Sequence, residues 1–400
     1  MTEYTRNVHF KYVIVGGGMT GDAAVHGIRE VDPEGTIGVI SAEPYTPYDR
    51  PPLSKGLWKD KPLESVWRDT GSQGVELRLG RQVRDLDPGT RRITDHEEVE
   101  FTFDKLLLAT GGTPRRLGSE VEGVIYFRTV DDYFTLRRLA EERQHFLIIG
   151  GGFIGSEIAA ALAMNGKRVT MVFPGEAIGD RVYPHDLALF LNDFYRQKGV
   201  EILPCETVCS VEKAGDSFTL STQSGRVILA DGVVAGLGIA PNVDLARGAN
   251  LMLDNGIVVD QFLRTSHPDI YAAGDVANFY NPALDRRLRV EHEDNANMMG
   301  KMAGRSMAGA PESYDHLPFF YSDLFELGYE AVGDLDARLE TVADWKEPFR
   351  EGVVYYLREG RVRGVLLWNV WGQVEAARRL IAEPGPFRPE DLKGRLPASS

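Results

Sequence analysis

One pattern occurs twice along the chain and restricts its fold more than any other feature. YVIVGGGMTGDAAVHGI (residues 12–28) and FLIIGGGFIGSEIAAALAMNG (residues 146–166) each join an apolar run to Gly-x-Gly-x-x-Gly and then to small and apolar residues. A strand, a glycine turn and a helix in this order let the backbone approach a pyrophosphate at the helix N-terminus. One such match is weak, but two copies in this setting predict two dinucleotide-binding units.

The residues after each copy indicate how a nucleotide would be held. Glu43 ends the strand in TIGVISAEP, where an acid takes the hydroxyls of a ribose. After the second copy, RVTMVFPGEAIGDR has Phe173 at the strand end, Glu176 just beyond it, and Arg181 as the nearest arginine. No arginine follows the strand directly to hold a 2′-phosphate. We therefore expect NADH to be preferred, with NADPH not excluded.

Composition excludes some classes of function. The 400-residue chain is too long for one ordinary core, and its 43% hydrophobic and 26% charged residues are typical of a soluble globular protein. A net charge of −14 disfavours nucleic acid as the main partner, because a phosphate backbone requires a basic surface. The sequence has neither a signal-peptide pattern nor an uncharged apolar run of membrane-spanning length. We expect a cytoplasmic protein without a membrane partner.

The cysteines and the last part of the chain give weaker signals. Cys205 and Cys209 have no neighbouring histidines, which disfavours a metal site, and we expect both to be small buried residues on or near a strand. From Leu317 onward, GVVYYLREGRVRGVLLWNVWG predicts two strands around a tight turn at Glu359 and Gly360, and QVEAARRLIAE predicts a helix. This region is interpreted as a small α+β domain for dimerisation or capping.

Several short motifs resemble known flavoproteins. ATGG at Ala109–Gly112 and AGD at Ala273–Asp275, taken with the two glycine patterns, resemble flavoproteins that have two dinucleotide-binding domains. YDRPPLSK at Tyr48–Lys55 resembles the ferredoxin-reductase and rubredoxin-reductase branch. RVEHEDNA, FYSDLFELGYEAVG and GVLLWN, starting at residues 289, 320 and 364, resemble the apoptosis-inducing-factor subfamily. The resemblance covers nearly the whole chain and implies a compact bacterial relative, without a role in programmed cell death.

The resemblance implies an α/β fold with two Rossmann-like domains and a small C-terminal α+β domain. The FAD-binding domain would comprise residues 1–115 and 245–316, with an NAD-binding domain of residues 116–244 inserted between them. Residues 317–400 would form a C-terminal domain of the interface or dimerisation type.

The resemblance also assigns residues to the two cofactors. The residues implied for FAD are Gly16, Gly18, Met19, Thr20 and Gly21 at the pyrophosphate, Glu43 at the ribose, Val83 at the adenine, Arg50 and Lys55 at the flavin, Arg128 and Asp275 at the ribityl phosphate, His292, Glu293 and Tyr321 at the isoalloxazine, and Ala109, Thr110 and Gly111 in the ATGG turn. The residues implied for the nicotinamide nucleotide are Gly150, Gly152, Phe153, Ile154, Gly155, Glu157, Glu176, Arg181, Gly238, Glu291, His292, Glu330 and Asn369.

Three positions depart from the family pattern. Tyr321 stands where the family often has tryptophan, which offers a smaller ring for stacking. Gly175 precedes Glu176 where mammalian relatives have an acid, so the ribose contact is left open. Glu293 stands where ferredoxin reductases often have tryptophan, which weakens a direct transfer of their partner specificity.

The chemistry follows from a missing residue type. No cysteine occurs in residues 1–204, so a flavin held there has no thiol pair to reduce and passes electrons directly to another acceptor. The resemblance places Lys55 near flavin N5 and pairs it with Glu157, so that the lysine would stabilise an anionic reduced flavin while Glu157 holds it. Phe153 is expected to cover the flavin as a gate, and His292 to form a polar wall of the pocket. The alternatives are an ordinary exposed lysine, a core phenylalanine and a satisfied core histidine.

Three functions remain open at this stage. The first is an NADH-dependent reductase of a small iron–sulfur protein, whose acidic surface would need a basic dock, with candidates Arg358, Arg361, Arg363, Arg378 and Arg379. The second is a redox-sensing flavoprotein, resembling apoptosis-inducing factor, in which a long-lived charge-transfer complex of reduced FAD and NAD⁺ controls a homodimer or partner binding. The third is reduction of a quinone or another small acceptor.

Overall fold

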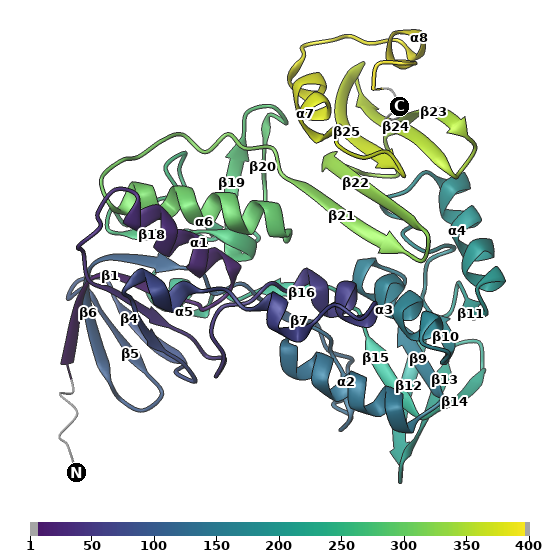
Figure 1. Cartoon of the computed structure of the whole chain (residues 1–400), viewed down its shortest axis with the longest axis horizontal. Coiled ribbons are helices and arrows are strands. Elements are labelled where there is room, and N and C mark those ends of the chain that lie inside the picture. Colours follow the sequence, from purple (N-terminus) through teal and green to yellow (C-terminus); the bar gives the residue numbers. More distant parts are fainter. Residues whose placement is uncertain (1–6, 397–400) are drawn as a thin grey trace. The chain divides into compact units, whose positions relative to one another are not determined.

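The computed structural model describes residues 7–396 and divides them into two compact units (Figure 1). Unit 1 comprises the described residues up to Asp49, together with Leu63–Thr113 and Ala240–Pro318. Unit 2 comprises Arg50–Pro62, Pro114–Ile239 and the described residues from Phe319 onward. The chain leaves unit 1 through β7 (Gly112–Pro114) and returns through β16 (Ile239–Pro241). Each unit is therefore built from separate stretches of sequence.

Unit 1 is centred on a largely parallel sheet. Its strand order is β3-β2-β1-β6-β5-β4, with β18 alongside β6. The strands are β1 (Asn7–Val15), β2 (Ile37–Ile40), β3 (Glu76–Arg78), β4 (Val83–Asp87), β5 (Arg92–Asp95), β6 (Glu100–Leu108) and β18 (Ile270–Ala272). The strands β3, β2, β1, β6 and β18 run parallel, whereas β4, β5 and β6 form antiparallel pairs. The apolar runs in β1 and β6 are buried, as expected for strands covered on both faces.

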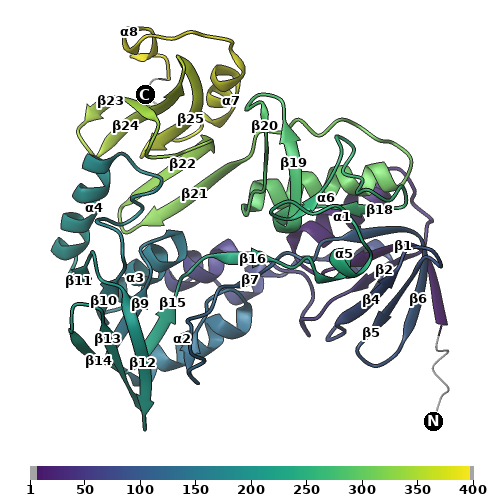
Figure 2. The ribbon, with the colours of Figure 1, turned by 180° about the vertical axis from the view of Figure 1, so that it is seen from behind.

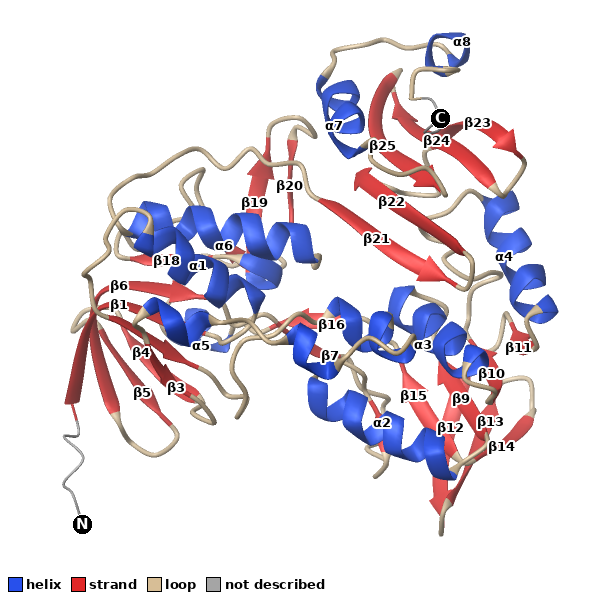
Figure 3. Ribbon diagram, in the orientation of Figure 1, coloured by secondary structure: helices blue, strands red, loops and turns tan. Residues whose placement is uncertain are grey.

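Two helices distant in sequence pack together in unit 1. In Figures 1 and 3, α1 (Met19–Arg29) and α6 (Glu293–Met307) lie side by side. Glycines allow this close approach, because a Cβ added at Gly27 would lie 2.0 Å from the carbonyl oxygen of Lys301, and one at Gly304 would lie 2.1 Å from that of Ala24. A Cβ at Gly300 would lie 2.3 Å from the carbonyl oxygen of Thr20, so the helix pair also holds the start of α1, where the first glycine pattern lies.

Smaller elements complete unit 1. Figure 2 shows β19 and β20 as a hairpin, and β17 runs parallel to β19. These elements are β17 (Ile257–Val258), β19 (Ala277–Asn281), β20 (Arg286–Leu288), α5 (Asp244–Gly248) and the 3₁₀ turns η3 (Leu63–Val66), η4 (Thr70–Gln73) and η5 (Gly274–Val276).

Unit 2 contains a second parallel sheet, of order β11-β10-β9-β15-β8. Its strands and helices are β8 (Val124–Ile125), α2 (Val130–Glu142), β9 (His145–Ile149), α3 (Phe153–Met164), β10 (Arg168–Val172), α4 (His185–Gln197), β11 (Val200–Leu203) and β15 (Gly232–Ala235). An antiparallel ladder of β12 (Val208–Ala214), β13 (Ser217–Thr222) and β14 (Val227–Ala230) shares a core with it through Leu147, Leu220 and Val233. The short turns η1 (Pro51–Ser54) and η2 (Gly56–Trp58) also belong to unit 2, and η1 packs against α2 and α3.

The last part of unit 2 is an antiparallel sheet of order β21-β22-β25-β24-β23. Its elements are β21 (Phe319–Leu324), β22 (Leu327–Gly333), β23 (Glu340–Glu347), β24 (Glu351–Arg358), β25 (Arg361–Trp368), α7 (Val374–Ala382) and α8 (Pro389–Leu392). We call it the C-terminal sheet. The predicted turn is confirmed, because Glu359 and Gly360 have φ of 53° and 70° and join β24 to β25. The predicted helix is α7, which packs on β22 and β25.

The predicted fold class is confirmed, whereas the domain boundaries stay a prediction. The cysteines lie on or near strands as expected, but the expectation that they are buried was wrong, because Cys205 and Cys209 are both exposed. Cys205 lies in the turn after β11 with φ of 57°, and Cys209 lies on β12 at the edge of its ladder, where one face meets solvent. Within residues 7–396, no helix is long and apolar enough to cross a membrane.

Candidate active site

The glycines of the first pattern fall into two groups, those that the fold requires and one that faces open space. Gly16 has φ of 123°, and a Cβ there would lie 2.1 Å from the carbonyl oxygen of Ala109. A Cβ at Gly21 would lie 2.2 Å from the carbonyl oxygen of Gly16. Gly18 differs, because its backbone is ordinary extended chain and a Cβ would meet nothing within 4 Å. The fold therefore requires Gly16 and Gly21, while the space at Gly18 suits a group from outside the chain.

The second pattern repeats this geometry in unit 2. Gly150 has φ of 111° and abuts the carbonyl oxygen of Gly236, 2.4 Å from an added Cβ. A Cβ at Gly155 would lie 2.1 Å from the carbonyl oxygen of Gly150, whereas one at Gly152 would meet nothing within 4 Å. Each middle glycine precedes a helix whose first backbone N–H groups can bind an anion. Both turns thus fit the pyrophosphate of a dinucleotide.

Other predicted motifs of unit 1 converge on the first turn. The ATGG segment supplies the Ala109 carbonyl beside Gly16, and Thr110 donates through Oγ1 to the carbonyl of Asn242 at 2.7 Å. The AGD turn packs against α1, because a Cβ added at Gly274 would lie 2.3 Å from Oγ1 of Thr20 on that helix. Asp275 follows directly in η5. The structure therefore gathers three separate sequence motifs around the start of α1, which begins at Met19.

The predicted adenosine residues have different surroundings. Glu43 is half-buried and accepts a hydrogen bond from the Tyr48 hydroxyl at 2.5 Å. Val83 is buried in the unit 1 core, so its side chain packs against protein, and Gly111 has φ of 63° in the ATGG turn. Tyr48 is a residue that the sequence alone did not single out as a partner of Glu43.

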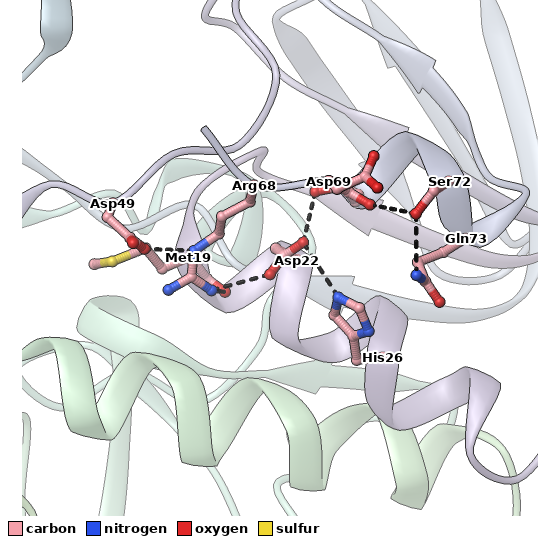
Figure 4. A network of polar contacts seen from close by, with 9 residues as sticks. Met19, Asp22, His26, Asp49, Arg68, Asp69, Ser72 and Gln73 are labelled. Carbon is pink, nitrogen blue, oxygen red and sulfur yellow. Dashed lines mark hydrogen bonds and ion pairs between the residues drawn. The ribbon is translucent and has the colours of Figure 1, made fainter. Parts of the chain in front are cut away.

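A polar network closes the base of the segment that carries Lys55 (Figure 4). The backbone N–H of Asp49 donates to the carbonyl of Val66, and that of Arg68 donates to the carbonyl of Pro47, both at 2.8 Å. The Arg68 guanidinium then bridges Asp49 Oδ1 at 2.6 Å and Asp22 Oδ2 on α1 at 2.9 Å. Residues 50–62 thus leave and re-enter unit 1 at a base held against the first helix.

Lys55 and Glu157 form an ion pair in unit 2. Lys55 Nζ lies 2.8 Å from Glu157 Oε1, and their side chains are 11% and 3% exposed. Ser54 donates to Glu157 Oε2 and Ser322 donates to Oε1, both at 2.6 Å. The two serine hydroxyls and the ion pair together fix the Glu157 carboxylate, which in turn fixes the Lys55 side chain. Ser54 lies next to Lys55 in the sequence and was open to prediction, but no sequence signal points to Ser322.

One aromatic ring contacts the lysine, and a pair of phenylalanine rings joins α3 to β21. Lys55 Nζ lies 5.3 Å from the centre of the Tyr321 ring, so a tyrosine supplies the cation–π contact here. Phe153 and Phe320 have ring centroids 5.2 Å apart. Arg50 Nη1 donates to the carbonyl of Arg128 at 2.8 Å, which ties the start of the segment to the loop before α2. Lys55 therefore contacts α3 through Glu157 and β21 through Tyr321, whereas Arg50 contacts the loop before α2.

The residues preceding α6 form a charged group in unit 1. Arg289 pairs with Glu291 at 2.7 Å and donates to the carbonyl of Asp275 at 2.9 Å. His292 is the N-cap residue of α6, and its carbonyl accepts the N–H of Ala296. Glu293 lies in the first helical turn and is half-buried. The predicted contacts Asp275, Glu291 and His292 therefore share one neighbourhood.

The predicted nucleotide residues of unit 2 lie in two places. Glu176 and Arg181 are exposed in the segment after β10, and Glu176 lies 3.9 Å from His185. Ile154 is partly exposed at the start of α3, and Gly238 has φ of 79° after β15. On the C-terminal sheet, burial raises the pKa of Glu330, although the Gly372 N–H donates to its carboxylate.

Asn369 has a clear structural role. Its Oδ1 accepts the N–H of Gly328 at 2.7 Å, and its Nδ2 donates to the carbonyl of Arg350 at 2.9 Å. The amide therefore satisfies backbone groups of the C-terminal sheet, and φ of 50° bends the chain there. A nucleotide contact by Asn369 would have to use the remaining capacity of this amide.

The arginines suggested for a partner dock are less available than expected. Arg363 is buried, and Arg378 pairs with Glu375 at 2.5 Å while stacking on Phe319. Arg358 and Arg379 are exposed. The predicted basic surface is therefore smaller than the sequence indicated. Among the described residues, no group of three or more His, Cys, Asp or Glu side chains is placed to hold a metal ion.

Comparison with known proteins agrees with this geometry. Residues 10–300 match the family model described as pyridine nucleotide-disulphide oxidoreductase. The chain belongs to this family. Residues 303–348 and 343–383 match the C-terminal model of apoptosis-inducing factor. The resemblance stated from the sequence is thus confirmed.

The chain is similar to several proteins of known name. The 5,5′-dehydrodivanillate O-demethylase ferredoxin reductase subunit of Sphingobium sp. is 36% identical, covering 88% of this chain and 89% of that protein. The anthranilate 1,2-dioxygenase system ferredoxin–NAD(+) reductase component of Burkholderia cepacia is 33% identical, with 95% and 96% covered. The putative apoptosis-inducing factor 1 of Drosophila melanogaster is 31% identical, with 93% of this chain and 63% of that protein covered.

Solved structures are similar over the whole chain. The putidaredoxin reductase–putidaredoxin complex has a TM-score of 0.90 at 30% identity, covering 96% of this chain and 95% of that one. A ferredoxin reductase from Rhodopseudomonas palustris has a TM-score of 0.88 at 28% identity, covering 95% and 96%. This family member is an oxidoreductase that uses FAD and NAD(H).

Proposed function

We propose that this oxidoreductase transfers electrons from NADH, through FAD, to a small iron–sulfur protein. The observation that carries the proposal is the buried Lys55–Glu157 pair in a chain without a cysteine in residues 1–204. A thiol relay is excluded there, while a fixed cation is in place to stabilise negative charge. The names of the Sphingobium and Burkholderia relatives support a ferredoxin as the acceptor.

Different residues of the chain have different roles in the proposed reaction. Bound FAD supplies the hydride acceptor and the release of single electrons. The backbone at Gly18 holds the FAD pyrophosphate, and that at Gly152 holds the nicotinamide nucleotide. Glu157 fixes Lys55, whose charge would stabilise a reduced flavin, and Phe153 would cover the flavin as a gate. The remaining cofactor residues implied by the resemblance, and the domain boundaries, are part of this proposal.

The electron donor and the cellular compartment can also be proposed. NADH is the preferred donor, because Glu176 is exposed on the segment after β10, where its carboxylate can accept hydrogen bonds from the ribose hydroxyls. The protein is proposed to act in the cytoplasm, where this donor is available.

The deciding experiment is an anaerobic stopped-flow titration of the purified FAD-loaded protein with one equivalent of NADH, then of NADPH. Flavin bleaching and the long-wavelength charge-transfer band are followed, and an oxidised [2Fe–2S] ferredoxin is then added. Fast bleaching followed by fast reoxidation with ferredoxin supports the proposal. Slow bleaching, or reoxidation by dichlorophenolindophenol but not by ferredoxin, contradicts it.

A second candidate is a redox sensor, favoured by the match to the C-terminal model of apoptosis-inducing factor. In this case NADH reduces the flavin slowly, the charge-transfer band persists in air, and the protein changes its oligomeric state. Size-exclusion chromatography with and without NADH distinguishes the candidates, because a reductase elutes at the same volume in both conditions.

A further inference from the structure

The segment that should contact the nucleotide sugar is held at both ends by different parts of unit 2. We call residues 174–185, between β10 and the first turn of α4, the nucleotide segment. The side chains of Glu176, Arg181 and His185 in this segment are exposed. Hydrogen bonds to its backbone fix where these side chains start.

The first half of the nucleotide segment is fixed by the nucleotide-binding fold itself. The N–H of Gly179 donates to the carbonyl of Gly151 in the glycine turn at 2.9 Å. Asn192 on α4 donates through Nδ2 to the carbonyl of Glu176 at 2.9 Å and accepts the N–H of Ile178 at 3.0 Å. Glu176 is therefore positioned by α4, independently of the C-terminal sheet.

The second half is fixed by the C-terminal sheet. The Tyr356 hydroxyl on β24 donates to the carbonyl of Val182 at 2.8 Å. The N–H of Ala337, between β22 and β23, donates to the carbonyl of Arg181 at 3.0 Å. Tyr183 is fully buried, and its ring meets the edges or faces of Tyr329 and Trp368 with centroids 5.7 and 5.8 Å away.

The two rings that contact Tyr183 are held in place by each other and by the sheet. Tyr329 and Trp368 are register partners on β22 and β25, and their rings stack with centroids 5.7 Å apart and planes 8° from parallel. Each directly precedes a residue implied at the nucleotide, Glu330 and Asn369. The rings that hold Tyr183 therefore lie next to those two residues: Glu330 follows Tyr329 on β22, and Asn369 is the first residue after β25.

We infer that Tyr183 and Tyr356 are positioning residues for the nicotinamide nucleotide, through which the C-terminal sheet sets the affinity for NADH. Neither side chain is assigned a contact with a cofactor. They act by fixing the backbone of residues 181–183, and with it the Arg181 end of the nucleotide segment. The inference rests on the proposed function, because it deepens the assignment of this segment to NADH.

The test uses two neighbouring tyrosines on one strand. Tyr356→Phe removes the hydroxyl that holds Val182 and keeps the ring. Tyr355→Phe removes the hydroxyl of an equally buried tyrosine, whose side chain points to the opposite face of β24. Both variants are prepared as FAD-loaded protein, and FAD content and melting temperature are measured first. NAD⁺ binding by calorimetry and steady-state kinetics with ferredoxin follow.

For Tyr356→Phe we expect the KM for NADH and the Kd for NAD⁺ to rise roughly fivefold, the effect of losing one hydrogen bond, with kcat at saturating NADH unchanged. Tyr355→Phe should match the wild type in all of these quantities. An unchanged KM and Kd in Tyr356→Phe, or an equal rise in Tyr355→Phe, overturns the inference. A wild-type protein that fails to bind NAD⁺ or NADH overturns the proposed function as well.

Discussion

Glu157 is the residue whose environment is most demanding, because its carboxylate is almost fully buried and is held by Lys55, Ser54 and Ser322. Burying a charge is tolerated only when the partner and further hydrogen bonds are all present. The pairing of Lys55 with Glu157 was implied by the resemblance, and the structure places the two atoms in contact. Ser322, which is 165 residues away from Glu157 in sequence, could not be predicted because only the folded strand β21 brings it there.

Lys55→Met should slow flavin reduction by NADH about 100-fold, since the fixed cation that stabilises the reduced flavin is lost. The measurement is the bleaching rate in an anaerobic stopped-flow instrument. Lys59→Met is the control, because Lys59 belongs to the same segment but pairs with Asp323 on an exposed surface. A bleaching rate equal to that of Lys59→Met would refute the role of Lys55.

Loss of Lys55 also leaves Glu157 buried without a cation, which costs about 3 kcal/mol of stability. The double variant Lys55→Met/Glu157→Gln should recover most of this stability without recovering the rate. Comparing melting temperatures with bleaching rates thus separates a structural effect from a chemical one.

Glu330→Gln should stabilise the protein near neutral pH. Burial raises the pKa of Glu330, so the ionised side chain opposes folding and wild-type stability falls as pH rises through that raised pKa. Glutamine does not titrate. The melting temperature of the Glu330→Gln variant should therefore match that of the wild type in acid and exceed it at higher pH. Thermal melts across the acid-to-neutral range check this, and a pH-independent difference would contradict it.

At the level of elements, both strand–turn–helix units were predictable because each glycine pattern lies between an apolar run and a helix. The turn between β24 and β25 was predictable from Glu359-Gly360. The ladder β12-β13-β14 was missed, although Gly215 and Gly225 mark its two turns with φ of 60° and 88°. Its sequence does not show which of its faces packs against the parallel sheet. The exposed cysteines show the same limit, because whether Cys209 faces the core or solvent depends on which face of β12 is covered.

Matched glycine substitutions test the assignment of the two turns. Gly152→Ala should fold with normal FAD content but raise the KM for NADH about tenfold, because its Cβ occupies only the space meant for the nucleotide. Gly18→Ala should instead lower FAD retention. Gly155→Ala is the contrast, since its Cβ would lie 2.1 Å from the Gly150 carbonyl and should lower the melting temperature. Equal KM values for Gly152→Ala and wild type would argue against the nucleotide assignment.

For the whole molecule, the family name refers to a disulphide, yet the chain has only Cys205 and Cys209 and both are exposed. The sequence predicted the absence of a thiol relay directly, because no cysteine precedes residue 205. The acceptor could not be read in the same way, since it depends on the surface that folding creates, as the buried Arg363 illustrates.

The double variant Cys205→Ser/Cys209→Ser should retain electron transfer from NADH to ferredoxin within about twofold of wild type, because neither thiol lies on the route. Steady-state rates measure this, and alkylation of the native protein with iodoacetamide should likewise leave the rate unchanged. A large loss of activity in the double variant would reveal a redox role for these cysteines.

The discontinuous units have a consequence for synthesis on the ribosome. Strand β6 pairs with β18, and about 160 residues separate the end of one from the start of the other. At the usual speed of translation, roughly 8 to 30 s pass between the synthesis of β6 and that of β18, while the segment from β8 to β15 leaves the ribosome. During this interval a buried apolar strand presents an open edge, which is a surface that chaperones recognise and that aggregation exploits. Slow codons within residues 114–239 would lengthen this exposure and should lower the yield of FAD-loaded protein.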